Sequence, residues 1–353
     1  MQAVVLVGGE GRRLRPLTET RPKPMVPLVD RPFVAHQIDL LYRHGVRDIV
    51  FSCGYRPDAL EAHFGDGSAH GVRLRYVVDP EPLGTAGAID NARDELDDGD
   101  VLVLNGDILT DLDLTAVVDA HRRAGAEASI VLTPVEDPSA YGLVRIDEER
   151  RVWEFLEKPT PDLLVPGEPY LINAGTYVLS RAAREAIPTG VSCSIEREVF
   201  PVLAERGTLY GHPSDAYWRD IGTHRSYLDA NLDVLDGTAR TALRVEGDRY
   251  VAGGARVEGD ARVERSVVAD GAVIAAGARV RDSVIGAGAR VDAGAVIDGS
   301  VVGAEARVGE GARVEGLMVL GDGAEVPAGM VLAGPGSVPC ETRASDADQE
   351  ARP

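Results

Sequence analysis

The second part of the chain repeats itself about every 17 residues, and this repeat restricts the possible folds more than any other feature. Three matching segments read E-R-S-V-V-A-D-G-A (264–272), R-D-S-V-I-G-A-G-A (281–289) and D-G-S-V-V-G-A-E-A (298–306). Within each repeat aliphatic residues recur in steps of six, six and five residues. Three short strands per turn, each with an inward-facing aliphatic side chain, predict a parallel β-helix. One series of inward-facing residues is expected at Val268, Ile285, Val302 and Val319.

Residues before the repeat alternate short apolar runs with helical patterns. Strands are expected at Ala3–Val7, Asp48–Cys53, Leu74–Val78, Val101–Asn105 and Ala128–Val135. Helices are expected at Pro32–His44, Pro57–Phe64, Thr85–Glu95 and Leu114–Ala124. This alternation predicts an α/β fold, a mostly parallel, Rossmann-like sheet covered on both faces. Ligands of such sheets bind beyond the carboxyl ends of the strands, so the loops after Val7 and Asn105 are expected to contact a ligand.

The change of pattern predicts how the chain divides into domains. With 353 residues the chain is long enough for two cores. We expect an α/β domain over residues 1–236, a linker over 237–250 and a β-helix domain over 251–340. The closing segment, residues 341–353, lacks apolar content and is expected to be a disordered tail.

The charge balance excludes one class of partner and singles out two residues. With 37 Lys+Arg against 57 Asp+Glu, the formal net charge is -20, which argues against a nucleic-acid-binding surface. A small phosphate ligand stays possible, because a few local cations suffice for it. Only two of the basic residues are lysines, Lys23 and Lys158, and the other 35 are arginines. Both lysines are therefore candidates for a specific role.

Nothing in the sequence predicts secretion or a membrane partner. The N-terminus has no basic region before its short apolar run. No apolar stretch approaches the length of about 18 residues that a membrane-spanning helix needs. The three cysteines are far apart and form no C-x-x-C pair, which predicts neither a disulfide framework nor a zinc site. A cytoplasmic location is expected.

A glycine-rich loop follows the first expected strand. It contains Gly8, Gly9, Gly11, Arg12 and Arg13. Backbone N–H groups of such a loop can approach phosphates, and arginines add bidentate donors. The loop lacks the G-K-[S/T] of a Walker loop, and Leu14 replaces the third glycine of the dinucleotide fingerprint, so a purely structural turn is the alternative. Shortly afterwards Lys23 stands between two prolines, which would hold its ammonium in place.

Taken together, V-G-G-x-G-x-R-L-R-P-L-T and P-K-P resemble motifs of the sugar-nucleotide pyrophosphorylases, which are nucleotidyltransferases acting on sugar 1-phosphates. Further matching motifs follow in order: E-P-L-G-T-A-G (81–87), L-N-G-D (104–107), Y-G (141–142), F-L-E-K-P (155–159), I-N-A-G-T-Y-V-L (172–179), I-E-R-E-V-F-P (195–201) and W-R-D-I-G-T (218–223). The resemblance spans nearly all of the first domain. A left-handed β-helix is a familiar appendage of that family, and the motifs are most similar to those of mannose-1-phosphate guanylyltransferases.

The resemblance implies transfer of a nucleotidyl group from a nucleoside triphosphate to a sugar 1-phosphate, with release of pyrophosphate. GTP and mannose 1-phosphate are the expected substrates and GDP-mannose the product. By this resemblance Arg13 stabilises the departing pyrophosphate, Lys23 contacts phosphate and Lys158 neutralises the sugar phosphate. Such a displacement depends on positioning and charge neutralisation more than on proton transfer.

The resemblance also implies binding roles for other residues. Sugar-binding positions are Gly142, Glu157, Asn173 and Gly175. The wall of the base pocket is expected from Leu6, Gly8, Glu81, Pro82, Gly84 and Thr85. Asp107 and Asp220 are expected to bind Mg²⁺ as well as substrate, because this cation prefers a few carboxylates together with substrate phosphates. Either Asp alone would more often cap or turn the chain.

Several alternatives remain at this point. Thymidine or uridine triphosphate with glucose 1-phosphate is the second choice of substrates, and a catalytically silent subunit that senses sugar nucleotides is a further one. Many β-helix proteins are acyltransferases with a histidine base, but no histidine follows His224. The exposed end and edges of a β-helix predict self-association, hence a homo-oligomer.

Overall fold

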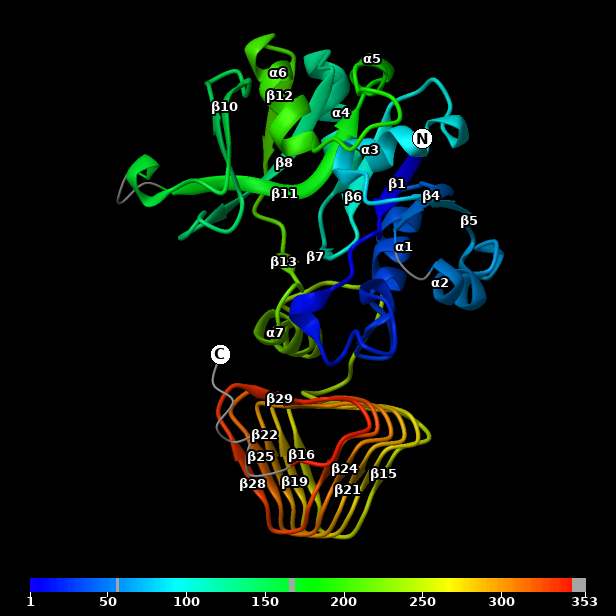
Figure 1. The fold of residues 1–353 in the computed structure, drawn as a ribbon, viewed down its shortest axis with the longest axis vertical. Coiled ribbons are helices and arrows are strands. Elements are labelled where there is room, and N and C mark those ends of the chain that lie inside the picture. The colour runs from blue at the N-terminus through cyan, green and yellow to red at the C-terminus, as the bar shows by residue number, and fades with distance from the viewer. Residues whose placement is uncertain (55–56, 165–168, 345–353) are drawn as a thin grey trace. The chain divides into compact units, whose positions relative to one another are not determined.

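The computed structural model describes residues 1–54, 57–164 and 169–344, and it divides into two compact units (Figure 1). Unit 1 consists of Met1–Gly9 and Gln37–Trp218. Unit 2 consists of Glu10–His36 and Arg219–Pro353. The boundaries expected at residues 236 and 250 stay predictions.

Unit 1 is built around a nine-stranded sheet. Its parallel part is formed by β1 (Gln2–Leu6), β4 (Asp48–Cys53), β5 (Arg73–Val78) and β6 (Val101–Asn105). The remaining strands are β8 (Ala128–Val135), β9 (Gly142–Ile146), β10 (Val152–Glu157), β11 (Tyr170–Leu179) and β12 (Leu209–Pro213). Strand β11 runs antiparallel to β6, β8 and β9, so the sheet as a whole is mixed. The α/β class with a Rossmann-like parallel core is confirmed.

Helices and short elements complete the α/β part of the chain. The helices are α1 (Phe33–Arg43), α2 (Pro57–Phe64), α3 (Gly84–Asn91), α4 (Leu114–Ala124), α5 (Arg181–Glu185), α6 (Phe200–Glu205) and α7 (His224–Leu235). Short strands are β2 (Pro27–Leu28), β3 (Arg31–Pro32), β7 (Ile108–Thr110) and β13 (Trp218–Asp220). Single helical turns are Arg12–Leu14, Lys23–Met25, Ser68–His70, Arg93–Glu95, Pro161–Leu163 and Ile195–Val199.

The helix predicted over Thr85–Glu95 is interrupted. It appears as α3 and a separate 3-10 turn, Arg93–Glu95. At the end of α3 the side chain of Asn91 turns outward and donates to the Val78 carbonyl and to Asp79.

Three parallel ladders form the β-helix of unit 2 (Figure 1). The first ladder contains β14 (Tyr250–Val251), β17 (Val267–Val268), β20 (Val284–Ile285), β23 (Val301–Val302), β26 (Met318–Leu320) and β29 (Gly336–Val338). The second contains β15 (Arg256–Val257), β18 (Val273–Ile274), β21 (Arg290–Val291), β24 (Arg307–Val308) and β27 (Glu325–Val326). The third contains β16 (Arg262–Glu264), β19 (Arg279–Arg281), β22 (Val296–Asp298), β25 (Arg313–Glu315) and β28 (Val331–Ala333). The predicted parallel β-helix is confirmed, and its three ladders are consistent with the left-handed type.

The period of the β-helix changes near its end. Val284 pairs with Val301, and Val301 pairs with Val319, so the later coil contains an additional residue. This residue lies at the corner around Leu317, whose backbone has a φ of 71°. As a result Leu320, not Val319, stacks on Val302, so the prediction of Val319 as the fourth inward-facing residue is wrong.

A ladder of buried serines lines one corner of the β-helix. Ser266, Ser283 and Ser300 are each 0% exposed. Each hydroxyl donates to the carbonyl oxygen two residues earlier and accepts a backbone N–H from the next coil. For Ser283 these bonds measure 2.5 Å to the Arg281 oxygen and 3.1 Å from the Ser300 nitrogen. The repeated serine therefore supplies hydrogen-bond partners to backbone groups that lie at the corner and are not paired within the strand ladders.

The coil continues past the predicted end of the β-helix. Arg343 forms a bridge with Glu325, and Ala344 is 4% exposed. Residues 341–344 therefore pack on the β-helix, in contrast to the disorder predicted for 341–353. Residues 345–353 of that predicted tail lie outside the described residues.

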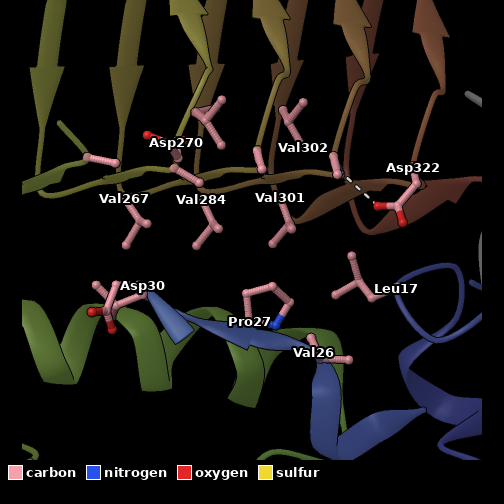
Figure 2. Close-up of a pocket in the computed structure, with 18 of the residues that line it drawn as sticks. Leu17, Val26, Pro27, Asp30, Val267, Asp270, Val284, Val301, Val302 and Asp322 are labelled. Carbon is pink, nitrogen blue, oxygen red and sulfur yellow. Dashed lines mark hydrogen bonds between the residues drawn. The ribbon is translucent and has the colours of Figure 1, made fainter. Parts of the chain in front are cut away.

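An apolar cavity of about 210 Å³ lies within unit 2 (Figure 2). Leu17, Val26 and Pro27 line one side of it, opposite the strand residues Val284 and Val301. Its lining, drawn from the described residues, includes none of the residues predicted to bind substrate. A search of the described helices for a segment long and apolar enough to span a membrane found none.

Candidate active site

Unit 1 brings several predicted residues to one edge of its parallel sheet. Leu6, the last residue of β1, pairs with Ser52 of β4 and with Asn105 of β6, so the loops after these strands leave at the same level. The Gly106 N–H donates to the Leu6 carbonyl over 2.9 Å, which holds the loop carrying Asp107 against the end of β1. The same edge carries Gly8 and Gly9, which follow β1 after Val7. Asp107, Gly8 and Gly9 therefore lie at the carboxyl ends of the strands, where ligands of such sheets commonly bind.

The loop after β5 places the expected base-pocket residues. Glu81 and Pro82 are exposed, whereas Gly84 approaches Cys193 so closely that a Cβ would lie 2.6 Å from its carbonyl oxygen. The Thr85 hydroxyl donates to Glu196 over 2.6 Å and accepts the backbone N–H of Ile195 over 2.9 Å. The Thr85 hydroxyl therefore already donates its proton to another side chain of the protein.

A bulge in β11 shapes the N-A-G motif. The register against β8 shifts between Asn173 and Tyr177. Across the bulge, Asn173 accepts the Gly175 N–H and donates to the Tyr177 hydroxyl, both over 2.9 Å. Gly175 has a φ of 70°, and a Cβ there would lie 2.8 Å from Nδ2 of Asn105. The motif thus needs glycine for both conformation and space, and it lies beside the end of β6.

Glu157 and Lys158 follow one another at the end of β10. Glu157 pairs with Gly142 of β9, where a Cβ would lie 3.0 Å from Oε2 of Glu157. Lys158 is exposed and has a φ of 53°, a left-handed conformation that side-chain-bearing residues seldom adopt. Its backbone N–H donates to the Tyr141 carbonyl over 2.9 Å, which supports this conformation. An acceptor carboxylate and a cation are thereby held side by side.

A cavity of about 310 Å³ adjoins this pair. It is lined by Phe155, Leu156, Glu157, Lys158, Pro159, Thr160, Leu163, Glu196, Arg197 and Pro201. Burial raises the pKa of Glu157, and the negative charge of Glu196 raises it further. The positive charges of Lys158 and Arg197 lower the pKa of Glu157 by smaller amounts. The cavity therefore combines two carboxylates with two cations.

Unit 2 holds the other predicted phosphate-binding residues. Lys23 is only 8% exposed, and its Nζ lies 3.9 Å from Oδ1 of Asp220. Gly11 packs against the Lys23 side chain, and a Cβ at Gly11 would lie 3.0 Å from Cβ of Lys23. At Gly222 a Cβ would lie 2.8 Å from Oδ1 of Asp220 and 2.9 Å from Nη2 of Arg13. Gly11, Arg13, Lys23 and Asp220 are thus neighbours within unit 2.

The adjacent Arg12 behaves differently from Arg13. Its Nε lies 2.5 Å from Oε2 of Glu10, and its side chain is 74% exposed. The guanidinium is already paired with this carboxylate. It is therefore the weaker phosphate-binding candidate of the two arginines.

The two carboxylates expected to bind Mg²⁺ belong to different units, Asp107 to unit 1 and Asp220 to unit 2. Both are half-buried, and oxygen donors of this kind suit a hard cation. Gly222 leaves space beside Asp220 that any larger residue would fill. Within residues 1–54, 57–164 and 169–344, no group of three or more His, Cys, Asp or Glu side chains forms a metal site. Each carboxylate taken alone offers oxygen donors of the kind that Mg²⁺ binds.

Sequence reasoning missed several residues of this region. Glu196 lies within the matched I-E-R-E-V-F-P motif, but its contact with Thr85 joins residues 111 positions apart. Trp218 donates from Nε1 to the Ala174 carbonyl over 2.9 Å. Its ring packs edge-on against the ring of Tyr141, with 5.4 Å between the ring centroids. Both residues lie in motifs that matched the family, and the match was the signal that could have identified them.

Comparisons with known proteins identify the family of this chain. A family model described as nucleotidyl transferase matches residues 2–237, and a model described as GMPPB C-terminal domain matches residues 245–349. A mannose-1-phosphate guanylyltransferase of Mycobacterium tuberculosis is 42% identical over 264 residues, covering 73% of this chain and 71% of the relative. A mannose-1-phosphate guanyltransferase of Debaryomyces hansenii is 36% identical over 260 residues, covering 72% and 70%. A probable mannose-1-phosphate guanylyltransferase 2 of Arabidopsis thaliana is 37% identical over 274 residues, covering 75% and 72%. The resemblance seen in the sequence is confirmed, and the chain belongs to the nucleotidyl transferase family.

Proposed function

We propose that this protein transfers a guanylyl group from GTP to mannose 1-phosphate, forming GDP-mannose and pyrophosphate. The observation that carries the proposal is the pair of Glu157 and Lys158 beside a cavity of about 310 Å³. A carboxylate next to an ammonium complements a sugar 1-phosphate, in which hydroxyl donors adjoin a phosphate dianion. The names of the similar proteins support guanine as the base and mannose as the sugar.

In the proposed reaction a phosphate oxygen of the sugar 1-phosphate attacks the α-phosphorus of GTP, and the bond to pyrophosphate breaks. Lys158 holds the attacking phosphate, while Arg13 and Lys23 offset the charge of the triphosphate and of the departing pyrophosphate. Asp107 and Asp220 would hold Mg²⁺, which supplies further positive charge to the phosphates when bound. These roles agree with the charge demands of an in-line displacement.

Binding of the two substrates is assigned to different sets of residues. The backbone of Gly8, Gly9 and Gly11 is proposed to approach the triphosphate. The guanine base is proposed to contact Leu6, Gly8, Glu81, Pro82, Gly84 and Thr85. The sugar is proposed to contact Gly142, Glu157, Asn173 and Gly175.

A substrate panel tests the proposal. GTP, UTP, dTTP and ATP are each combined with mannose 1-phosphate or glucose 1-phosphate, and pyrophosphate release is measured. We expect GTP with mannose 1-phosphate to give the highest kcat/KM. Preference for UTP or dTTP with glucose 1-phosphate would overturn the choice of substrates. Nucleotide binding without pyrophosphate release from any pair would instead indicate a silent, sugar-nucleotide-sensing subunit.

We further propose that the protein acts in the cytoplasm as a homo-oligomer assembled through its β-helix, without nucleic-acid or membrane partners. A chain that ends at residue 240 should sediment with fewer subunits than the full-length protein. An unchanged number of subunits would exclude the β-helix as the association surface.

A further inference from the structure

Glu196 is a second carboxylate beside the candidate sugar site, and none of the predicted roles includes it. It lies in a π-helical segment one turn long, Ile195–Val199, directly before α6. Turns of this kind occur frequently at functional sites. Glu196 is half-buried and lines the same cavity as Glu157 and Lys158.

The carboxylate of Glu196 is held by two hydroxyl groups. Oε2 accepts the Thr85 hydroxyl over 2.6 Å and the Ser194 hydroxyl over 2.8 Å. Because Thr85 accepts the Ile195 N–H over 2.9 Å, its own proton is directed to Glu196. Both bonds use the same oxygen, and Oε1 has no hydrogen-bond donor among the residues that the structure describes. One oxygen therefore fixes the carboxylate, and the other keeps its capacity to accept hydrogen bonds.

The charges around the cavity indicate the kind of ligand that this oxygen would accept. Glu157 and Glu196 supply acceptors, and Lys158 and Arg197 supply positive charge. An inorganic phosphate would interact with the two cations but offer the two carboxylates few hydrogen-bond donors, whereas a sugar 1-phosphate presents both an anion and several hydroxyl donors. Charge-assisted hydrogen bonds from hydroxyls to carboxylates are stronger than neutral ones.

We propose that Glu196 is a specificity-determining residue that accepts a hydrogen bond from a ring hydroxyl of the sugar 1-phosphate, and that Thr85 and Ser194 are the residues that position it. This inference rests on the proposed function. It gives Thr85 a role on the sugar side, through Glu196, in addition to its expected place in the base pocket.

A purely structural role for Glu196 is the competing explanation, because its bond to Thr85 joins the start of α3 to the turn before α6. Glu196→Gln separates the two explanations. An amide oxygen can still accept from Thr85 and Ser194, but the negative charge is removed. Glu205→Gln, at an exposed position of α6, makes the same charge change away from the cavity and serves as the matched control.

The experiment measures kcat and KM for both substrates, with mannose 1-phosphate and with its 2-, 3-, 4- and 6-deoxy analogues. For Glu196→Gln we expect the KM for mannose 1-phosphate to rise roughly tenfold to a hundredfold, as for loss of a charged hydrogen bond, while the KM for GTP stays within about twofold. In the wild type and in Glu205→Gln, one deoxy analogue should have a much lower kcat/KM than mannose 1-phosphate. In Glu196→Gln this difference in kcat/KM should be much smaller. The same ratio of kcat/KM between mannose 1-phosphate and each deoxy analogue in all three proteins would overturn the proposal.

Thr85 provides the test of positioning. Thr85→Val removes the hydroxyl and should raise the KM for mannose 1-phosphate, whereas Thr85→Ser retains the hydroxyl and should restore it. If the KM for mannose 1-phosphate stays raised in Thr85→Ser, the cause is a change in packing and not the loss of the hydroxyl. If Glu196→Gln does not fold, Glu196→Asp keeps the charge but shortens the reach, and an unchanged sugar KM in that variant would also contradict the proposal.

The proposed function and this inference fail in different ways. A wild-type protein that makes no GDP-mannose contradicts the proposed function, and the deoxy series is then repeated with the sugar phosphate that the protein does accept. Normal GDP-mannose synthesis with identical sugar selectivity in Glu196→Gln contradicts the inference alone.

Discussion

Replacing Ser283 by alanine tests whether the serine ladder stabilises the β-helix corner. The substitution removes a hydroxyl that accepts the Ser300 N–H over 3.1 Å and donates to the Arg281 carbonyl over 2.5 Å. Ser300 is 0% exposed, so water does not replace the lost acceptor without local opening. Leaving a buried backbone N–H without a partner costs about 1–3 kcal/mol. This cost corresponds to a roughly 5- to 150-fold larger equilibrium constant for opening of that corner.

Amide hydrogen exchange measures this opening directly. In full-length protein, a peptide that contains Ser300 should exchange roughly 5- to 150-fold faster in Ser283→Ala than in the wild type. Ser192→Ala, at an exposed position of unit 1, is the control and should leave the exchange of this peptide unchanged. Equal protection of the Ser300 peptide in wild type and Ser283→Ala would refute the role assigned to the ladder.

Three further predictions concern the active site. Lys23→Arg and Lys158→Arg should each lower kcat/KM severely although the charge is kept, because a guanidinium fork does not replace a compact ammonium; wild-type kinetics in both would contradict this. Asp107→Asn and Asp220→Asn should lower turnover by orders of magnitude with an unchanged circular dichroism spectrum, and near-normal activity in saturating Mg²⁺ would exclude a metal role. Because its pKa is raised above the ordinary 4.5, Glu157 should take up its proton at a higher pH than an ordinary glutamate as the pH falls. The KM for mannose 1-phosphate should therefore rise more on acidification in the wild type than in Glu157→Gln, in which only the substrate phosphate still takes up a proton.

Local patterns predicted the elements of both units well. Strands β4, β6 and β8 and helices α2 and α4 have the predicted bounds, because runs of apolar residues and helical periodicity are properties of the adjacent sequence. The β-helix was equally accessible, since each coil repeats the same aliphatic and small residues.

Features that depend on distant partners were not accessible in the same way. The Thr85–Glu196 bond and the antiparallel pairing of β11 with β6 join segments far apart in the chain, and neither leaves a periodic pattern. The additional residue near Leu317 was missed because Val319 and Leu320 are both aliphatic, so the spacing alone favoured the shorter step. Composition and pattern singled out the two lysines and the glycine-rich loop. The other candidate site residues were identified only through the family resemblance, since a lone Asp or Gly fits many turns.

The contrast between a buried Lys23 and an exposed Lys158 has a practical consequence for solution studies. Apart from the backbone terminus, these side chains are the only primary amines in the sequence. Reductive methylation with ¹³C-formaldehyde would therefore introduce very few NMR signals, and both lysine signals would come from candidate phosphate-binding residues. Amine acylation should modify Lys158 much faster than Lys23, because a buried amine reacts slowly. The arginine-rich composition thus turns two native side chains into spectroscopic reporters of ligand binding without an engineered label.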